Sequence, residues 1–290
     1  MKLNIIVLAK QVPDTRNVGS NAMNPDGTIN RAALPAIFNP EDLNALEQAL
    51  RLKEEYPESK ITVLTMGPQR AADILREALY RGADEAVLLT DRAFAGADTL
   101  ATSYALATAI KKIGEYDIVV CGRQAIDGDT AQVGPQVAQQ LDVPQVTYVK
   151  RILSVGEGCV TVERSIENGV EVVKAPLPLL LTVDGSAEEC RPQNVYRMLR
   201  FHRAATPSEQ AAEGYKYAAQ VANDEALTIK EWSLADVNGD ASRCGLSGSP
   251  TKVRKVENIV FQTKESKRYT ASDEDIKRLV GELLNNHTIG

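Results

Sequence analysis

The chain has 290 residues, an apolar content of 43% and a formal charge of −6, from 33 basic and 39 acidic side chains. This length and aliphatic composition allow one substantial core, so we expect one main domain, with an extension. No basic run could follow a phosphate backbone, which argues against a nucleic-acid partner. No apolar run reaches the roughly 18 residues needed to cross a bilayer, so any membrane role would pass through a partner protein.

The spacing of the cysteines and the sequence of the amino terminus bear on the cellular compartment that we expect for the protein. The four cysteines lie far apart without a CxxC pair, and the chain enters a predicted strand without a signal-peptide pattern. We therefore expect a reduced, cytoplasmic protein. The two histidines stand in no metal-binding or triad arrangement, so we predict no metal ligand and no catalytic residue.

Strands and helices alternate through the first half of the chain. Apolar runs predict buried strands at 3–9, 61–65, 86–90 and 118–121. Apolar spacing predicts helices from Pro40, over 74–79 and over 100–110, with Asn39 and then Asp98 or Thr99 as N-caps and Gly82 ending the second helix. The fold class is therefore α/β, with a doubly wound, mainly parallel, Rossmann-like sheet.

Four loops are expected to meet at one edge of this sheet. Ala9, Thr65, the loop after Thr90 and the loop from Gly122 all follow the carboxyl ends of predicted parallel strands. Ligands of such sheets bind at that edge, so the sequence predicts a ligand crevice there.

The second half of the chain has a different character. Asn168-Gly169 between alternating runs predicts an antiparallel hairpin within 160–173, and 178–183 reads as a further strand. Residues 185–225 are predicted to form a partly helical surface segment. We expect a nucleotide-binding domain over 1–225 and, over 226–290, a carboxyl-terminal arm that ends in a helix. Ser272 is the expected N-cap of this helix, which carries an apolar stripe.

The stretch 117–136, DIVVCGRQAIDGDTAQVGPQ, combines a strand, a small-residue loop and a helix start. The apolar spacing of its helix makes Asp129 or Thr130 the expected N-cap. Backbone N–H groups at a helix start attract phosphate, and Gly128 would let a ligand come close. An ordinary strand-to-helix turn explains the spacing equally well, because neither GxGxxG nor GxxxxGKS is present.

The motif GRQAIDGDTAQVGPQ at 122–136 resembles the nucleotide-binding signature of electron transfer flavoprotein β subunits. Further matching stretches follow in the family's order: KQVPDT, FNPEDLNALEQALRLKE, LTMGP and LYRGADEAVLLTDRAFAGADT. The resemblance covers about the first 185 residues, and GLSGSPTKV at 245–253 resembles part of the family's carboxyl-terminal arm.

The resemblance implies an adenine-nucleotide site and an electron carrier that pairs with a flavin-bearing α subunit. The cofactor-binding residues it implies are Ala9, Asn39, Asp42, Thr65, Met66, Phe94, Thr99, Cys121, Gly122, Arg123, Gln124, Gly128, Asp129, Thr130, Ala131, Gln132 and Val133. Asn39 and Thr65 are expected near the adenosine. In the family, the region at 185–225 recognises partner dehydrogenases, although CRPQNVYRML departs from the usual pattern.

Two cofactors are possible in this family, AMP or a second FAD that receives electrons from NADH and divides them between two acceptors. DRAFAGADT at 91–99 resembles the two-FAD, bifurcating type, and its small residues would leave space beside an isoalloxazine ring. We therefore expect FAD, with AMP as the alternative. Arg123 at the strand end could contact the flavin or a phosphate, or form a structural ion pair.

Two other functions remain open from the residues alone. The chain could be an AMP-holding structural β subunit, or a nucleotide-binding module of the universal-stress type, whose usual glycine-rich loop is absent here. Asp127 and Asp129 could be paired catalytic carboxylates, but no nucleophile stands near them, and capping or loop geometry explains them better.

Overall fold

A computed structural model describes residues 1–14, 35–252 and 266–289 of the chain. Most of the turn-rich stretch at 24–35 and the last residue of GLSGSPTKV lie outside these residues.

The described residues form a twisted sheet in the order β11-β5-β4-β1-β6-β10-β7-β8-β9. The strands are β1 (Asn4–Leu8), β4 (Lys60–Met66), β5 (Glu85–Leu89), β6 (Ile118–Gly122), β7 (Gln145–Gly156), β8 (Cys159–Ile166), β9 (Gly169–Pro176), β10 (Leu179–Val183) and β11 (Lys230–Trp232). Pairing is parallel from β11 to β7 and antiparallel from β7 to β9. A separate small pair joins β2 (Gln11–Pro13) to β3 (Ala36–Phe38).

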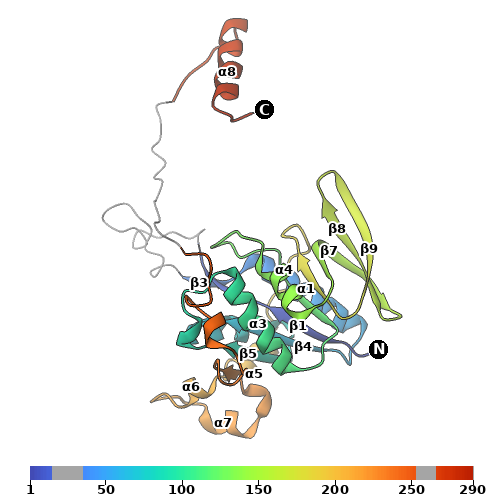
Figure 1. Ribbon diagram of the computed structural model, residues 1–290, viewed down its shortest axis with the longest axis vertical. Helices are drawn as coiled ribbons and strands as arrows, with labels where there is room; N and C mark the ends of the chain where they lie inside the picture. The colour runs from blue at the N-terminus through green and yellow to red at the C-terminus, as the bar shows by residue number, and fades with distance from the viewer. Residues whose placement is uncertain (15–34, 253–265, 290) are drawn as a thin grey trace.

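Helices cover both faces of the parallel sheet (Figure 1). The helices are α1 (Pro40–Glu55), α2 (Ala72–Arg81), α3 (Thr99–Ile113), α4 (Val133–Leu141), α5 (Val195–Phe201), α6 (Pro207–Gln210), α7 (Ala218–Asn223) and α8 (Asp273–Asn285). Leu46 of α1 and Leu75 of α2 belong to one core with Ile5. Ile110 of α3 and Val137 of α4 belong to a second core with Ile6. Because neighbouring strand residues point to opposite faces, this division confirms the doubly wound α/β fold.

Most predicted elements are confirmed within a residue or two. Gly82 ends α2 with a φ of 137°, which suits glycine, and Asp98 caps α3 by accepting a hydrogen bond from the N–H of Ala101. The predicted hairpin β8–β9 is confirmed, although its turn residues are Glu167 and Asn168, and Gly169 already pairs with Ile166. Ser272 caps α8 through the N–H of Asp275.

Three details of the helices differ from the predictions. Helix α4 begins at Val133 behind Gln132, which makes no side-chain cap, so neither Asp129 nor Thr130 is its N-cap. The reason is that Asp129 and Ala131 have left-handed backbone, which a helix cannot contain. Asn39 stands at the cap position of α1 but makes no capping bond. Leu100, predicted on the buried face of α3, is 40% exposed.

The predicted arm contains a strand that the sequence did not indicate. Strand β11 pairs in parallel with β5 at the sheet edge, and Val237 and Cys244 are buried in the second core. Helix α8 carries the predicted apolar stripe, with Ile276, Val280 and Leu284 exposed. None of the described helices is long and apolar enough to span a membrane.

Candidate functional site

The direction of chain winding changes between β1 and β6. From β1 the chain proceeds to β4 and β5 on one side, and it then returns to β6 on the other side of β1. In open α/β sheets a crevice forms at the carboxyl ends of the two strands where this reversal occurs. The loops after β1 and β6 therefore border the candidate site.

The carboxylate of Asp42, in the first turn of α1, joins these two loops. One oxygen accepts the N–H of Lys10 at 2.9 Å, and the other accepts the N–H of Gly122 at 2.9 Å. Asp42 is buried, and this burial raises the pKa of its carboxyl to about 7 although both backbone donors favour the ionised form. Asp42 thus fixes the relative positions of the two loops that border the crevice.

Asn39 and Glu41 hold the loop after β6 in place. Asn39 donates from Nδ2 to the carbonyl of Gln124 at 2.9 Å and accepts the N–H of Ile126 at 3.1 Å. Glu41 accepts the N–H of Gln124 at 3.0 Å and a guanidinium hydrogen of Arg123 at 2.9 Å. Arg123 therefore forms the structural ion pair that was one of its two expected roles, while a contact to a cofactor stays a prediction.

The segment 125–133, which we call the crevice loop, has an unusual backbone. Asp129 and Ala131 adopt φ values of 48° and 52°. Left-handed backbone at non-glycine residues costs about 1–2 kcal/mol each and is concentrated at functional sites. Among the described residues, no acceptor is found for the backbone N–H groups from Thr130 to Val133. Consecutive N–H groups of this kind form an anion-binding concavity.

Neighbouring side chains hold the crevice loop in place. Lys10 pairs with Asp127 at 2.8 Å across the crevice, and Gln124 donates to Asp129 at 2.9 Å. These partners explain both aspartates as loop geometry, as expected. A Cβ at Gly128 would meet nothing within 4 Å, so this side of the loop is open.

Two glycines allow the helices to approach the strands closely. A Cβ at Gly122 would lie 2.6 Å from Oδ1 of Asp42, and one at Gly134 would lie 2.7 Å from Cγ2 of Thr182 and 3.0 Å from Sγ of Cys121. Gly122 and Cys121 thus contribute packing. Gly134 was missed by the sequence analysis, since a glycine inside a helix pattern gives no clue to what lies opposite.

An unsatisfied hydroxyl lies at the end of β4. Thr65 is fully buried, and its Oγ1 has no hydrogen-bond partner among the described residues. Leaving a buried hydroxyl unpaired costs roughly 1–3 kcal/mol. Beside Thr65 lies a cavity of about 370 Å³. Its lining residues are Met66, Gly67, Pro68, Thr90, Asp91, Arg92, Phe94 and Ala95.

The loop after β5 is held by the predicted arm. Leu246 donates its N–H to the carbonyl of Ala95 at 3.1 Å, and the Cβ position of Gly96 faces Leu246 at 3.5 Å. The small residues of this loop therefore admit the arm on one side. Phe94 is buried and lines the cavity on the other side.

The structure brings most of the predicted residues to one edge of the sheet. Ala9 donates its N–H to Leu64 at 3.0 Å, which ties the end of β1 to β4. The hydroxyl of Thr99 donates to Oε1 of Gln132 at 2.9 Å and so links α3 to the crevice loop. Whether the predicted residues touch a cofactor stays a prediction. Lys10 and Glu41 are further residues of the site; the acidic first turn of α1 was the available signal for Glu41.

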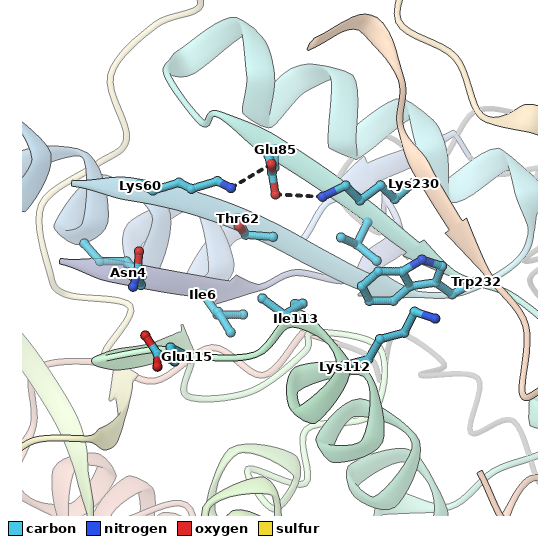
Figure 2. A pocket seen from close by; sticks show the side chains of 12 residues that line it. Asn4, Ile6, Lys60, Thr62, Glu85, Lys112, Ile113, Glu115, Lys230 and Trp232 are labelled. Carbon is cyan, nitrogen blue, oxygen red and sulfur yellow. Dashed lines mark hydrogen bonds and ion pairs between the residues drawn. The ribbon is translucent and has the colours of Figure 1, made fainter. Parts of the chain in front are cut away.

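A second cavity, of about 270 Å³, lies at the amino ends of the same strands (Figure 2). Glu85 pairs there with Lys60 at 2.7 Å and Lys230 at 3.0 Å, beside the ring of Trp232. Three of its charged side chains, Glu85, Lys60 and Lys230, pair with each other, and it lies at the opposite end of the strands from the loops of the crevice.

The fold defines a doubly wound α/β protein with a crevice at the switch point of its sheet, the place where ligands of such folds bind. Residues 26–222 match the family described as "Electron transfer flavoprotein domain". The chain is 44% identical to the electron transfer flavoprotein subunit beta of Thermoanaerobacterium thermosaccharolyticum over 99% of this chain and 100% of that protein. It is also 44% identical to the caffeyl-CoA reductase-Etf complex subunit CarD of Acetobacterium woodii, over 87% and 86% of the two chains. It is 39% identical to protein FixA of Rhizobium meliloti, over 97% and 90%.

This chain belongs to the electron transfer flavoprotein β subunit family. The coarse function is thereby established as electron transfer, in a family whose β subunits pair with an α subunit. The family match also decides against the universal-stress-type alternative.

Proposed function

We propose that the chain binds the adenosine and phosphates of a cofactor in the crevice between β1 and β6. The observation that carries this proposal is the crevice loop, where strained backbone leaves N–H groups from Thr130 to Val133 without a protein acceptor. A cofactor phosphate would satisfy them at the start of α4, where the helix dipole favours negative charge. The orphaned hydroxyl of Thr65 would hydrogen-bond to the adenosine.

The cofactor we propose is FAD. AMP in the crevice would leave the cavity lined by Met66 and Phe94 unfilled, whereas FAD has an additional ring system that needs such a place. FAD, when bound, supplies the capacity to accept a hydride and pass electrons on singly. The residues at the end of β6 would orient the flavin, because the Glu41 ion pair holds Arg123, and Gln124 is anchored at Asp129.

A ligand count tests this proposal directly. The chain is co-expressed with its α subunit and purified without oxygen, and the bound ligands are extracted and quantified. Two FAD molecules per heterodimer, with bleaching on addition of NADH, would support a bifurcating subunit. One FAD with one AMP, and no response to NADH, would favour the second candidate, a β subunit in which AMP has a structural role.

For the partner dehydrogenase we propose the segment around α5 as the docking surface. Val195, Tyr196 and Leu199 are 65%, 85% and 61% exposed, which is unusual for large apolar side chains. The base of the segment is nevertheless held to the sheet domain by hydrogen bonds. Arg197 donates to the carbonyls of Leu79 at 2.6 Å and Ala83 at 2.5 Å.

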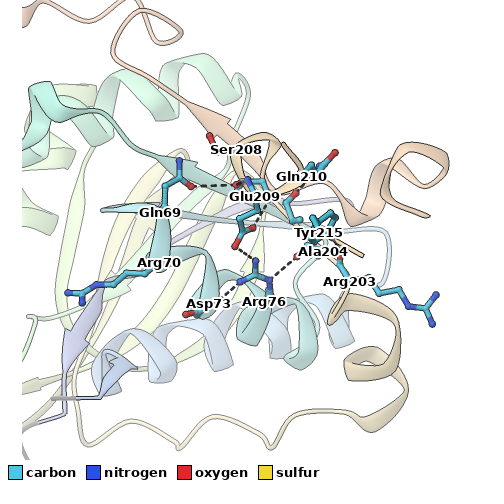
Figure 3. Close-up of polar contacts among 12 residues, drawn as sticks. Gln69, Arg70, Asp73, Arg76, Arg203, Ala204, Ser208, Glu209, Gln210 and Tyr215 are labelled. Carbon is cyan, nitrogen blue, oxygen red and sulfur yellow. Dashed lines mark hydrogen bonds and ion pairs between the residues drawn. The ribbon is translucent and has the colours of Figure 1, made fainter. Parts of the chain in front are cut away.

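The chain after α5 is fixed in the same way (Figure 3). Arg76 of α2 pairs with Glu209, and it also donates to the carbonyl of Ala204 at 2.8 Å. An anchored segment presents its exposed side chains with little ordering cost on binding. Replacing Leu199 with Ala should therefore slow electron transfer to the physiological dehydrogenase several-fold while the nucleotide content stays unchanged. Equal transfer rates would contradict this docking surface.

For residues 226–290 we propose contact with the α subunit. The exposed apolar stripe of α8 needs a cover, and a heterodimer partner provides one. Because β11 belongs to the sheet, a chain that ends at Lys252 tests the proposal more cleanly than one that ends at 225. The shortened chain should fold and lose co-purification with the α subunit; retained co-purification would contradict the proposal.

A further inference from the structure

The segment 244–251, which we call the strap, is seated tightly on the loop after β5. A Cβ at Gly245 would lie 2.2 Å from the carbonyl oxygen of Ala93, and one at Gly248 would lie 2.0 Å from the carbonyl carbon of Arg243. Ser249 is only 4% exposed, and its hydroxyl donates to the carbonyl of Gly245 at 2.6 Å. The strap therefore has one narrowly defined conformation on the sheet domain.

Asp98 connects the strap to helix α3. Its Oδ1 accepts the N–H of Ala101 at 3.0 Å and caps the helix, while its Oδ2 accepts the N–H of Thr251 at 3.0 Å. Its own N–H donates to the hydroxyl of Ser249 at 2.8 Å. Although partial burial opposes it, hydrogen bonding to these backbone donors lowers the pKa of Asp98, so the carboxylate is charged at neutral pH and its bonds are charge-assisted.

The next residue connects α3 to the crevice. Thr99 donates to Oε1 of Gln132, and Gln132 is the residue that precedes α4 and ends the left-handed part of the crevice loop. Gln132 also accepts, through its carbonyl, the N–H of Gln136 at 3.0 Å, which is the first bond of α4. A path thus runs from Thr251 to the proposed phosphate site through the hydrogen bond to Asp98, the peptide bond from Asp98 to Thr99, and the hydrogen bond from Thr99 to Gln132.

We infer that the strap is a positioning element for the nucleotide site, with Asp98 as its positioning residue. It sets the wall of the cavity through the loop after β5, and it sets the start of α4 through Thr99 and Gln132. The same strap leads into the carboxyl-terminal residues proposed to contact the α subunit, so docking of that subunit and binding of the nucleotide would support each other. The nucleotide part of this inference rests on the proposed function.

Asp98→Asn tests the inference. The one amide oxygen of Asn can still cap the helix about as well as Asp, but its NH₂ group is a donor and cannot accept the N–H of Thr251. In the full chain without nucleotide, hydrogen exchange should accelerate at Thr251 and also at Gln136, on the far side of the path. With AMP or FAD as the probe, affinity should fall about threefold to tenfold, the usual effect of one hydrogen bond. Asp240→Asn is the matched control, because Asp240 caps a short turn at Ser242 outside the strap.

Two results separate a positioning role from a merely structural one. In a Gln132→Ala background, Asp98→Asn should no longer change exchange at Gln136, because the path is already broken. Unchanged exchange at Gln136 and unchanged affinity, with a loosened strap, would overturn the inference. If neither the heterodimer of the parent chain nor those of the variants hold AMP or FAD while exchange at Gln136 still responds, the proposed nucleotide function fails and the coupling stands.

Discussion

Two loops at the carboxyl edge of the sheet satisfy their backbone in opposite ways. The loop after β5, at 91–98, directs hydrogen bonds to the strap, and its glycine faces Leu246. The crevice loop after β6 has its side chains paired with neighbours but leaves the N–H groups from Thr130 to Val133 without a protein acceptor. The first loop is completed by its own chain, whereas the second has open N–H groups that the proposed cofactor would complete.

This difference indicates how the molecule divides its tasks. Asn39 and Asp42, at the start of α1, accept hydrogen bonds from the backbone of Ile126 and Gly122. These bonds hold the crevice loop and the strand end before it, so the strained backbone is maintained without a ligand. Preorganisation of this kind reduces the ordering cost of binding. The stability of such a fold should tolerate changes on the open side of the loop and be sensitive to changes at its support.

The largest expected effect is at the support. In Gly122→Ala the new Cβ would meet Oδ1 of Asp42 at 2.6 Å and the backbone of Glu41 at 2.7 Å. Because backbone cannot move as freely as a side chain, we expect a loss of about 1–3 kcal/mol in unfolding free energy by urea denaturation. Gly128→Ala is the control, since nothing lies within 4 Å of that position. Equal stability of the two variants would refute the division between support and open side.

A second prediction uses the pH dependence of stability. Folded Asp42 holds its proton to about pH 7, whereas the unfolded carboxyl releases it near 3.8. Between these values the folded state binds more protons, so its contribution to unfolding free energy falls as pH rises, by at most about 1.4 kcal/mol per pH unit. Urea midpoints from pH 4 to 8 should show this decline in the parent and a flatter profile in Asp42→Asn. Parallel profiles would contradict the pKa of Asp42.

The smallest effect sharpens the comparison at β4. Thr65→Val removes a buried hydroxyl that has no partner among the described residues. Without nucleotide the variant should be about 1 kcal/mol more stable by thermal or urea unfolding, because the desolvation cost disappears. The nucleotide should bind more weakly to it, and Thr62→Val is the control away from the crevice. A variant that is less stable without nucleotide would show that the hydroxyl has a structural partner.

Local signals predicted the parallel sheet and the edge that carries the site, because strand alternation, Gly82 and Asn168-Gly169 act over a few residues. The start of α4 was predicted wrongly, since apolar spacing cannot register that Ala131 adopts a left-handed φ. Strand β11 was missed because its three residues are too few to show the alternation of apolar and polar side chains that predicts a strand. The contacts of Asp42 and Asp98 join residues 80 and 153 positions apart, a distance over which sequence patterns carry no information.

The nucleotide content of Gly128→Val tests the central claim, that the crevice loop binds the cofactor's phosphates. A Cβ at this position meets nothing within 4 Å, so with an unchanged fold a loss of ligand would report on the ligand's approach. The heterodimer of the parent chain and that of the variant are purified in parallel, their circular dichroism is compared, and total FAD and AMP are quantified after extraction. We predict an unchanged fold with the β-subunit nucleotide lost; full nucleotide content in the variant would contradict the claim.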